Sequence, residues 1–400
     1  MPMSIIRNFL KLEAASGIIL FITATVAIIL VNSPLSVVYE SVLQTNFTLK
    51  AGSFELSESL LFWINEGLMT LFFLLVGLEL KREFLEGELV GLSRIMLPGI
   101  GAVGGMLIPA VIFIVLNHHS SVTIKGWAIP MATDIAFALG VLSLFSRRVP
   151  IGLKLFLMAL SIFDDVGAIV IIALFYSHGF SWLYFLLAVL IIFILWLFNA
   201  ILKVRILFPY LILGVVVWGC VLHSGVHASI TGVILSLTIP LRQSANGNIA
   251  PLHYLEEALH PWVAYVVMPV FAFANAGLSF AGLSWASLKE PLVIGIILAL
   301  FIGKQLGVFS SAWLIVKLGW AKLPEHTTWL EMYGVALICG VGFTMSLFLG
   351  TLAFQSEDPI YLTDVRLGVL IGSVLSGLMG AMILRFCFRK ERKGGLFDSE

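Results

Sequence analysis

Two adjacent aspartates, Asp164 and Asp165, lie in the middle of a long apolar segment, LKLFLMALSIFDDVGAIVIIALFYS. This segment covers residues 153–177 and exceeds the roughly 20 residues that a helix needs to cross a bilayer. A carboxylate at the centre of a membrane helix costs about 2.5–3.5 kcal/mol on insertion scales, and two ionised neighbours also repel each other. Because buried carboxylates bind protons and small cations, the pair predicts a site for ion-coupled transport.

Two other apolar segments carry an ionisable group at a similar depth. Asp134 lies near the centre of WAIPMATDIAFALGV, and Lys304 lies midway along LFIGKQLGVF. A buried ion pair that only fixes helix packing is the structural alternative. That alternative explains Lys304 and one aspartate but leaves two carboxylates unexplained. Four ionisable groups on three predicted helices therefore favour a transport site at the midplane of the membrane.

The same region contains two apolar spans whose residues predict an interruption of the helix. The residues at these breaks are Pro130, Thr133 and Asp134 in the fourth span, and Gly340, Gly342 and Thr344 in the eleventh. A membrane helix tolerates a break only where the freed backbone groups face protein or water. Half-helix ends carry partial charges, so we expect Asp134 to offset positive N-terminal ends and Lys304 to offset negative C-terminal ends.

Composition assigns these segments to a polytopic, all-α membrane protein. The 400 residues are 60% hydrophobic and 12% charged, whereas soluble domains carry about 25% charged residues. The net charge is zero and no basic arm is present, which argues against a nucleic-acid partner. The three cysteines are far apart, so they predict neither a disulfide framework nor a metal site, and we expect no cofactor. We predict one transporter domain over residues 1–400.

Hydropathy predicts about twelve transmembrane helices that position the ionisable groups. They are 12–31, 59–80, 95–116, 123–145, 151–176, 182–200, 206–219, 221–238, 258–280, 291–313, 328–353 and 364–386. Spans three to five and ten to twelve each have a broken middle helix. This layout predicts two inverted repeats, because a unit of three spans reverses topology.

Basic residues predict the orientation of the spans. Lys50, Lys125, Lys289 and Arg366 are the basic residues of the odd-numbered gaps, whereas eighteen lie in even-numbered gaps or near the termini. By the positive-inside rule, both termini are cytoplasmic, as is the tail at 387–400.

Two surface features suggest further roles. Residues 45–58 contain two short alternating runs around a glycine, which favours an external β-hairpin that packs on a second copy of the chain, although an ordinary exposed loop is the alternative. At the cytoplasmic ends of the second and ninth spans, charged residues suggest a mouth that senses pH, although a solvated helix end is an equal alternative. These residues are Glu79, Arg82, Glu83 and Glu256.

The motifs together resemble the NhaA-type bacterial sodium/proton antiporters over residues 10–386. The motifs that carry the resemblance are GWAIPMATDIAFALGVLSLF, FLMALSIFDDVGAI, SGVHASITG, LHPWVAYVVMPVFAFANAG and CGVGFTMSLF. The resemblance also implies inverted repeats around broken helices, which are known of this family. The resemblance implies a multi-pass protein of the bacterial inner membrane, whose fourth and eleventh helices unwind and cross at mid-membrane.

The resemblance also implies roles for individual residues. Asp164 and Asp165 are expected to bind Na⁺ or Li⁺ and to exchange protons, with Asp134 and Thr133 at the crossing and Lys304 opposite them. Gly340, Gly342 and Thr344 are expected to support the crossing. The four charged cytoplasmic residues match positions linked to pH response, and the hairpin matches the dimer contact of the family. The loop RQSANGNIAP at 242–251 departs from the family in its low charge, which leaves the pH set-point open.

Competition between cations and protons for one carboxylate pair predicts antiport for sodium and pH homeostasis. If sodium requires both carboxylates to be deprotonated, more protons than sodium ions move and the exchange is electrogenic. Three other classes fit less well. An intramembrane aspartyl protease needs its aspartates on separate helices, a membrane prenyltransferase needs DDxxD near the aqueous face, and a passive cation channel would conduct without coupling.

Overall fold

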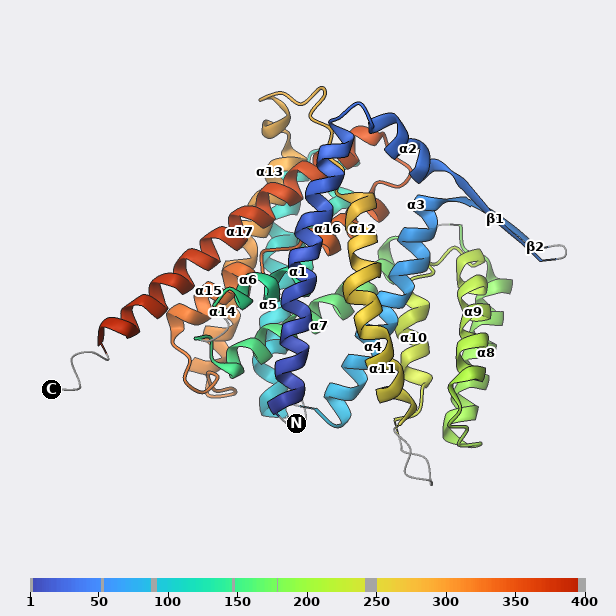
Figure 1. The fold of residues 1–400 in the computed structure, drawn as a ribbon, viewed down its shortest axis with the longest axis horizontal. Coiled ribbons are helices and arrows are strands. Elements are labelled where there is room, and N and C mark those ends of the chain that lie inside the picture. The colour runs from blue at the N-terminus through green and yellow to red at the C-terminus, as the bar shows by residue number, and fades with distance from the viewer. Residues whose placement is uncertain are drawn as a thin grey trace. The chain divides into compact units, whose positions relative to one another are not determined.

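The structure is a computed structural model that describes residues 3–51, 54–87, 92–145, 148–177, 179–241 and 250–394. Within these ranges, seven helical segments are long and apolar enough to cross a membrane. Three further pairs of helices, each bent at a short break, raise the number to ten at most among the described residues. The prediction of a mainly helical protein with several membrane-span candidates is therefore confirmed, and Figure 1 shows the helices, whereas the predicted count of twelve spans is not confirmed.

The chain divides into two compact units, and all of the ionisable residues predicted at mid-depth belong to the first. Unit 1 comprises residues 1–28, 89–168 and 275–400. Its helices are most of α1 (Met3–Val31), α5 (Leu92–Asn117), η2 (Thr123–Met131), α6 (Ile135–Ser143), the larger part of α7 (Ile151–Phe175), η4 (Ser287–Lys289), α13 (Pro291–Leu298), η5 (Ala299–Gly303), α14 (Lys304–Lys317), α15 (Trp329–Ile338), α16 (Phe343–Ala353) and α17 (Pro359–Gly394).

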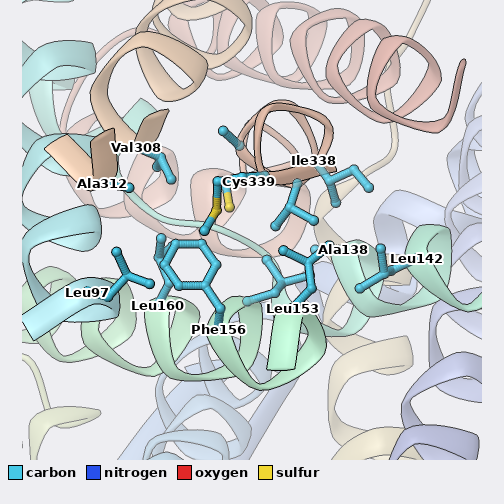
Figure 2. Close-up of a cluster of buried hydrophobic side chains, with 14 of the residues drawn as sticks. Leu97, Ala138, Leu142, Leu153, Phe156, Leu160, Val308, Ala312, Ile338 and Cys339 are labelled. Carbon is cyan, nitrogen blue, oxygen red and sulfur yellow. The ribbon is translucent and has the colours of Figure 1, made fainter. Parts of the chain in front are cut away.

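A buried apolar cluster in unit 1 aligns the helices that carry the site. Figure 2 shows Leu153, Phe156 and Leu160 of α7 against side chains of α5, α6, α14 and the break after α15. Leu153, Leu157 and Leu160 recur at helical spacing, and Asp164 follows four residues after Leu160. The apolar stripe of α7 therefore fixes the face on which Asp164 lies.

Close backbone packing sets the position of α14. A Cβ atom on Gly307 would lie 2.2 Å from the carbonyl oxygen of Gly104, and one on Gly303 would lie 2.8 Å from the Cα of Pro109. Glycines four residues apart thus let α14 approach α5 more closely than any larger residue allows. Lys304 lies between these two glycines, so the contact with α5 fixes the place of its backbone.

Unit 2 comprises residues 29–88 and 169–274. Its elements are α2 (Ser36–Gln44), β1 (Asn46–Ala51), β2 (Phe54–Ser59), α3 (Leu60–Phe62), η1 (Trp63–Leu68), α4 (Met69–Leu85), α8 (Trp182–Ala200), α9 (Leu207–His223), α10 (Ile230–Thr238), α11 (Pro251–Trp262), η3 (Val263–Val267) and α12 (Met268–Asn275). Helix α4 packs on α10, where Lys81 donates to the carbonyl oxygens of Leu237 and Ile239 at 2.7 and 2.6 Å. A residue predicted only as a cytoplasmic charge therefore caps the end of α10.

The predicted hairpin is confirmed as a two-stranded antiparallel sheet. Strand β1 pairs with β2 from Asn46 opposite Ser59 to Ala51 opposite Phe54, and Figure 1 shows the strands between α2 and α3. Phe47 and Leu49 lie two residues apart in β1, and more than two-fifths of each side chain is exposed. One face of the strand is therefore apolar and accessible within unit 2.

Several predicted boundaries move for local reasons. The ninth span begins at Pro251 rather than at 258, because proline suits the first position of a helix. The last helix continues to Gly394, past the predicted end at 386. Residues 224–229 separate α9 from α10 and are not helical, whereas the sequence predicted almost continuous helices there. Most of the loop predicted at 242–251 lies outside the described residues.

Candidate ion-binding site

Asp134 holds together the two interrupted spans. The first is bent by 45° between η2 and α6, and the second by 42° between α15 and α16. Asp134 is the N-cap of α6, where its Oδ1 accepts a hydrogen bond from the amide of Phe137 at 3.0 Å. Its Oδ2 accepts from the amide of Thr344 at 3.0 Å and from the Thr344 hydroxyl at 2.5 Å. One buried carboxylate therefore caps the positive ends of two half-helices.

Backbone contacts join the same two breaks directly. The amide of Asp134 donates to the carbonyl oxygen of Val341 at 2.8 Å. A Cβ atom on Gly340 would lie 2.4 Å from the carbonyl oxygen of Leu300, so the chain passes η5 at a distance that only glycine permits. Gly342 is the N-cap residue of α16. The predicted residues of the eleventh span thus lie at its break and against neighbouring backbone.

Hydroxyl groups pair with further backbone groups at the half-helix ends. The Thr133 hydroxyl lies 2.9 Å from the carbonyl oxygen of Cys339, at the end of α15. Ser346 donates to the carbonyl oxygen of Ile129 in η2 at 2.7 Å, and Ser373 of α17 accepts from the amide of Phe343 at 3.2 Å. Neither serine was singled out in the sequence. Ser346 lies four residues after Gly342, so the sequence could have predicted that it lies close to the break. Nothing in the sequence around Ser373 indicates its partner.

Lys304, Asp164 and Thr133 form a compact buried cluster. The Nζ of Lys304 lies 2.5 Å from Oδ2 of Asp164 and donates to the hydroxyl of Thr133 at 3.1 Å. The Thr133 hydroxyl lies 2.7 Å from the same Asp164 oxygen. All three residues have 0% exposure. Because a hydroxyl carries one proton, Thr133 divides its donation between Asp164 and Cys339, and this division links the ion pair to the break.

The contacts of Lys304 differ from the expected ones. The sequence suggested that it offsets the negative ends of half-helices, but its ammonium contacts a carboxylate and a hydroxyl. The carbonyl ends accept instead from Thr133 and Ser346. A π-helical turn, η5, ends immediately before Lys304. Such turns are rare in helices and are frequent at functional sites.

Asp165 follows Asp164 on α7 and is equally inaccessible, with 1% exposure. Oδ2 of Asp164 accepts from Lys304, whereas no hydrogen bond reaches Oδ1 from any described residue. The Asp134 carboxylate is occupied by helix ends. Of the three mid-depth aspartates, Asp164 therefore has one oxygen committed to a cation and one open to a ligand.

The predicted cytoplasmic residues also cluster, within unit 2. Arg82 contacts Glu83 at 2.7 Å and reaches Glu256 of α11 at 3.2 Å. Glu256 and Glu79 are each only 7% exposed. The cluster is more enclosed than the solvated helix end that was the alternative. It joins α4 to α11 through charge, and a charge change there would alter the contact between these helices.

Comparison with known proteins shows similarity to sodium/proton antiporters. Residues 7–384 match the family model described as Na+/H+ antiporter 1. The chain is 52% identical to the Na(+)/H(+) antiporter NhaA of Rhodospirillum rubrum over 97% of this chain and 99% of the relative. It is 52% identical to that of Nitrobacter hamburgensis, over 96% and 92%, and 49% identical to that of Pseudomonas putida, over 98% and 100%.

Proposed function

Because this chain belongs to the Na+/H+ antiporter 1 family, we propose that it exchanges cytoplasmic Na⁺ for external H⁺ at Asp164 and Asp165. Membership of this family supports a multi-pass membrane transporter rather than an enzyme. The observation that carries the proposed site is the buried ion pair of Asp164 with Lys304, beside a second buried carboxylate. Burying a charged group away from water costs free energy, and ionisable residues inside membrane helices therefore mark ion pathways by default.

The proposed exchange follows from competition for oxygen atoms. Carboxylate and hydroxyl oxygens suit small hard cations such as Na⁺ and Li⁺. Protons and the ammonium of Lys304 compete with sodium for the same oxygens. The site therefore holds either sodium or these other cations, but not both. Sodium bound by both carboxylates displaces the proton of Asp165 and separates Lys304 from Asp164, and we infer that Lys304 then gives up its own proton. Two protons leave for each sodium ion in this scheme, and the exchange is electrogenic.

The two interrupted spans supply the proposed moving part. Thr133 contacts Asp164 on one side and the end of α15 on the other, while Asp134 caps α6 and α16. A change in the occupant of Asp164 therefore alters a contact at the break. We infer twelve spans with inverted repeats, in which these two helices cross at mid-membrane and one bundle rocks around the site in alternating access.

Orientation and regulation complete the proposal. The distribution of basic residues supports cytoplasmic termini and tail, in the inner membrane of a bacterium, with the whole chain as one transporter domain. The contact of Arg82 with Glu83 and Glu256 supports a cytoplasmic pH response that also involves Glu79. The exposed apolar face of the hairpin supports a homodimer through residues 45–58.

Substitution of either aspartate tests the site. Asp164→Asn and Asp165→Asn each keep a side chain of similar shape but remove the negative charge, so sodium-dependent proton movement should fall to background in everted vesicles. Glu257→Gln, an exposed carboxylate of α11, is the matched control and should exchange normally. Normal exchange by either Asn variant would remove the assignment. Sodium flux in liposomes without proton movement would indicate a passive channel instead.

A further inference from the structure

Ser161 of α7 is a buried hydroxyl with unused hydrogen-bonding capacity. Its exposure is 0%, and no hydrogen bond reaches its Oγ from any described residue. Serines in apolar helices ordinarily donate to the carbonyl oxygen three or four residues earlier. Ser177, two residues after the end of α7, does so to Ala173 at 2.9 Å, and Ser143 at the end of α6 does so to Gly140 at 2.6 Å. Ser161 departs from this pattern, and burial of an unpaired hydroxyl costs free energy.

The spacing along α7 places Ser161 beside the two aspartates. Asp164 is three residues further along and Asp165 is four residues further, so both neighbour Ser161 on the helix surface. Oδ2 of Asp164 is occupied by Lys304 and Thr133, but Oδ1 has no hydrogen-bond partner among the described residues. Two unpaired oxygen atoms of different chemistry therefore lie within one turn.

We propose that the hydroxyl oxygen of Ser161 is a ligand of the transported sodium ion and sets its affinity relative to that of the proton. This inference rests on the proposed function of Asp164 and Asp165. The oxygen of a hydroxyl has lone pairs that stabilise a dehydrated cation. It does not take up a proton under physiological conditions, unlike a carboxylate. Ser161 thus strengthens sodium binding without strengthening proton binding, which is the difference that specificity requires.

Ser161→Ala separates this role from a structural one. Loss of one ligand to a charged ion should raise the sodium KM and the sodium Kd about tenfold. The maximal exchange rate at saturating sodium should stay within about twofold, because substitution of a ligand that binds ground state and transition state alike changes KM alone. The thermal midpoint of the purified protein should not fall, since the hydroxyl has no partner to lose. Ser161→Thr keeps a hydroxyl at this position, so its sodium KM should equal that of the unmodified protein.

The control is Ser229→Ala, which removes another buried hydroxyl without a hydrogen-bond partner among the described residues, in unit 2. Its sodium KM, from exchange in proteoliposomes, and its sodium Kd, from calorimetry, should both equal those of the unmodified protein. An unchanged sodium KM in Ser161→Ala would overturn the inference, as would an equal increase in Ser229→Ala or a fall in thermal midpoint that accounts for the change.

If Asp164→Asn is inactive while Ser161→Ala binds normally, only this inference fails. Normal exchange by Asp164→Asn removes the proposed function itself.

Discussion

The ion pair between Lys304 and Asp164 is completely buried, yet its presence does not imply stability. Removing two charges from water costs several kcal/mol per ion, and their attraction offsets this cost only with good geometry and extra hydrogen bonds. Here the separation is 2.5 Å, and Thr133 supplies a hydrogen bond to the same oxygen. The pair therefore has the geometry and the extra hydrogen bond by which attraction can offset the cost of burial, and the proposed exchange requires sodium to replace Lys304 at Asp164.

Removal of Lys304 tests this balance. In Lys304→Ala the carboxylate of Asp164 stays buried without its cation, and we expect a loss of about 3–5 kcal/mol in the free energy of unfolding. The double variant Lys304→Ala/Asp164→Asn should recover most of this loss. The measurement is the thermal midpoint of the purified protein in detergent.

Lys322→Ala, which removes an exposed lysine, is the control for the loss of one positive charge. It should change stability by no more than about 0.5 kcal/mol. If the double variant remains as unstable as Lys304→Ala, then Lys304 stabilises the protein through something other than its pair with Asp164.

Among the elements, the four half-helices depend on side chains from elsewhere for their hydrogen bonds. Asp134 caps α6 and α16, Ser373 accepts from the first amide of α16, and Thr133 and Ser346 donate to carbonyl oxygens of α15 and η2. In an apolar medium each unpaired backbone group would cost several kcal/mol. The interruption is thus a stable arrangement held by polar side chains, and α14 must be positioned accurately to bring Lys304 to it.

Gly307→Ala tests the positioning of α14. The added Cβ would lie 2.2 Å from the carbonyl oxygen of Gly104, so α14 must move away from α5 and carry Lys304 with it. We expect overpacking to cost about 1–3 kcal/mol in stability and exchange to fall with it. Thermal midpoint and vesicle exchange are both measured.

Gly219→Ala in α9 provides the matched control, because no described atom lies within 4 Å of the added Cβ. Alanine there should leave exchange intact and raise stability by about 0.5–1 kcal/mol, since glycine is a poor helix former. A Gly307→Ala protein with normal stability and exchange would show that the close approach is not required.

At the scale of the whole molecule, the chain presents two apolar side chains of β1 that are about half exposed. Phe47 and Leu49 of β1 are 56% and 46% exposed, whereas Leu56 of β2, which pairs with Leu49, is buried. An edge strand with apolar side chains invites pairing with another chain. The proposed partner is a second copy of this protein.

Leu49→Lys tests this interface. A charge on the apolar face of β1 should convert a dimer into a monomer at micromolar concentration, as measured by size-exclusion chromatography with light scattering in detergent. Thr48→Lys changes the neighbouring residue, whose side chain points to the opposite face of the strand, and should leave the dimer intact. If the Leu49→Lys protein dimerises as well as the Thr48→Lys protein, the hairpin is not the dimer contact.

The sequence alone determined which residues are unusual for their surroundings, because the cost of such residues is local. Charged residues inside apolar segments identified Asp134, Asp164, Asp165 and Lys304, and proline and glycine located both breaks. Alternation located the hairpin. These signals are local, because insertion cost, helix breaking and strand alternation depend on neighbours in the chain.

Tertiary structure alone decided which of these residues meet. Asp164 pairs with Lys304 across 140 positions, and Asp134 reaches Thr344 across 210. Periodicity says nothing about such distant partners, so Lys304 was expected at carbonyl ends and the capping roles of Ser346 and Ser373 were missed. The unpaired hydroxyl of Ser161 also emerged only from the fold, because hydrogen-bond satisfaction depends on every atom packed around a group.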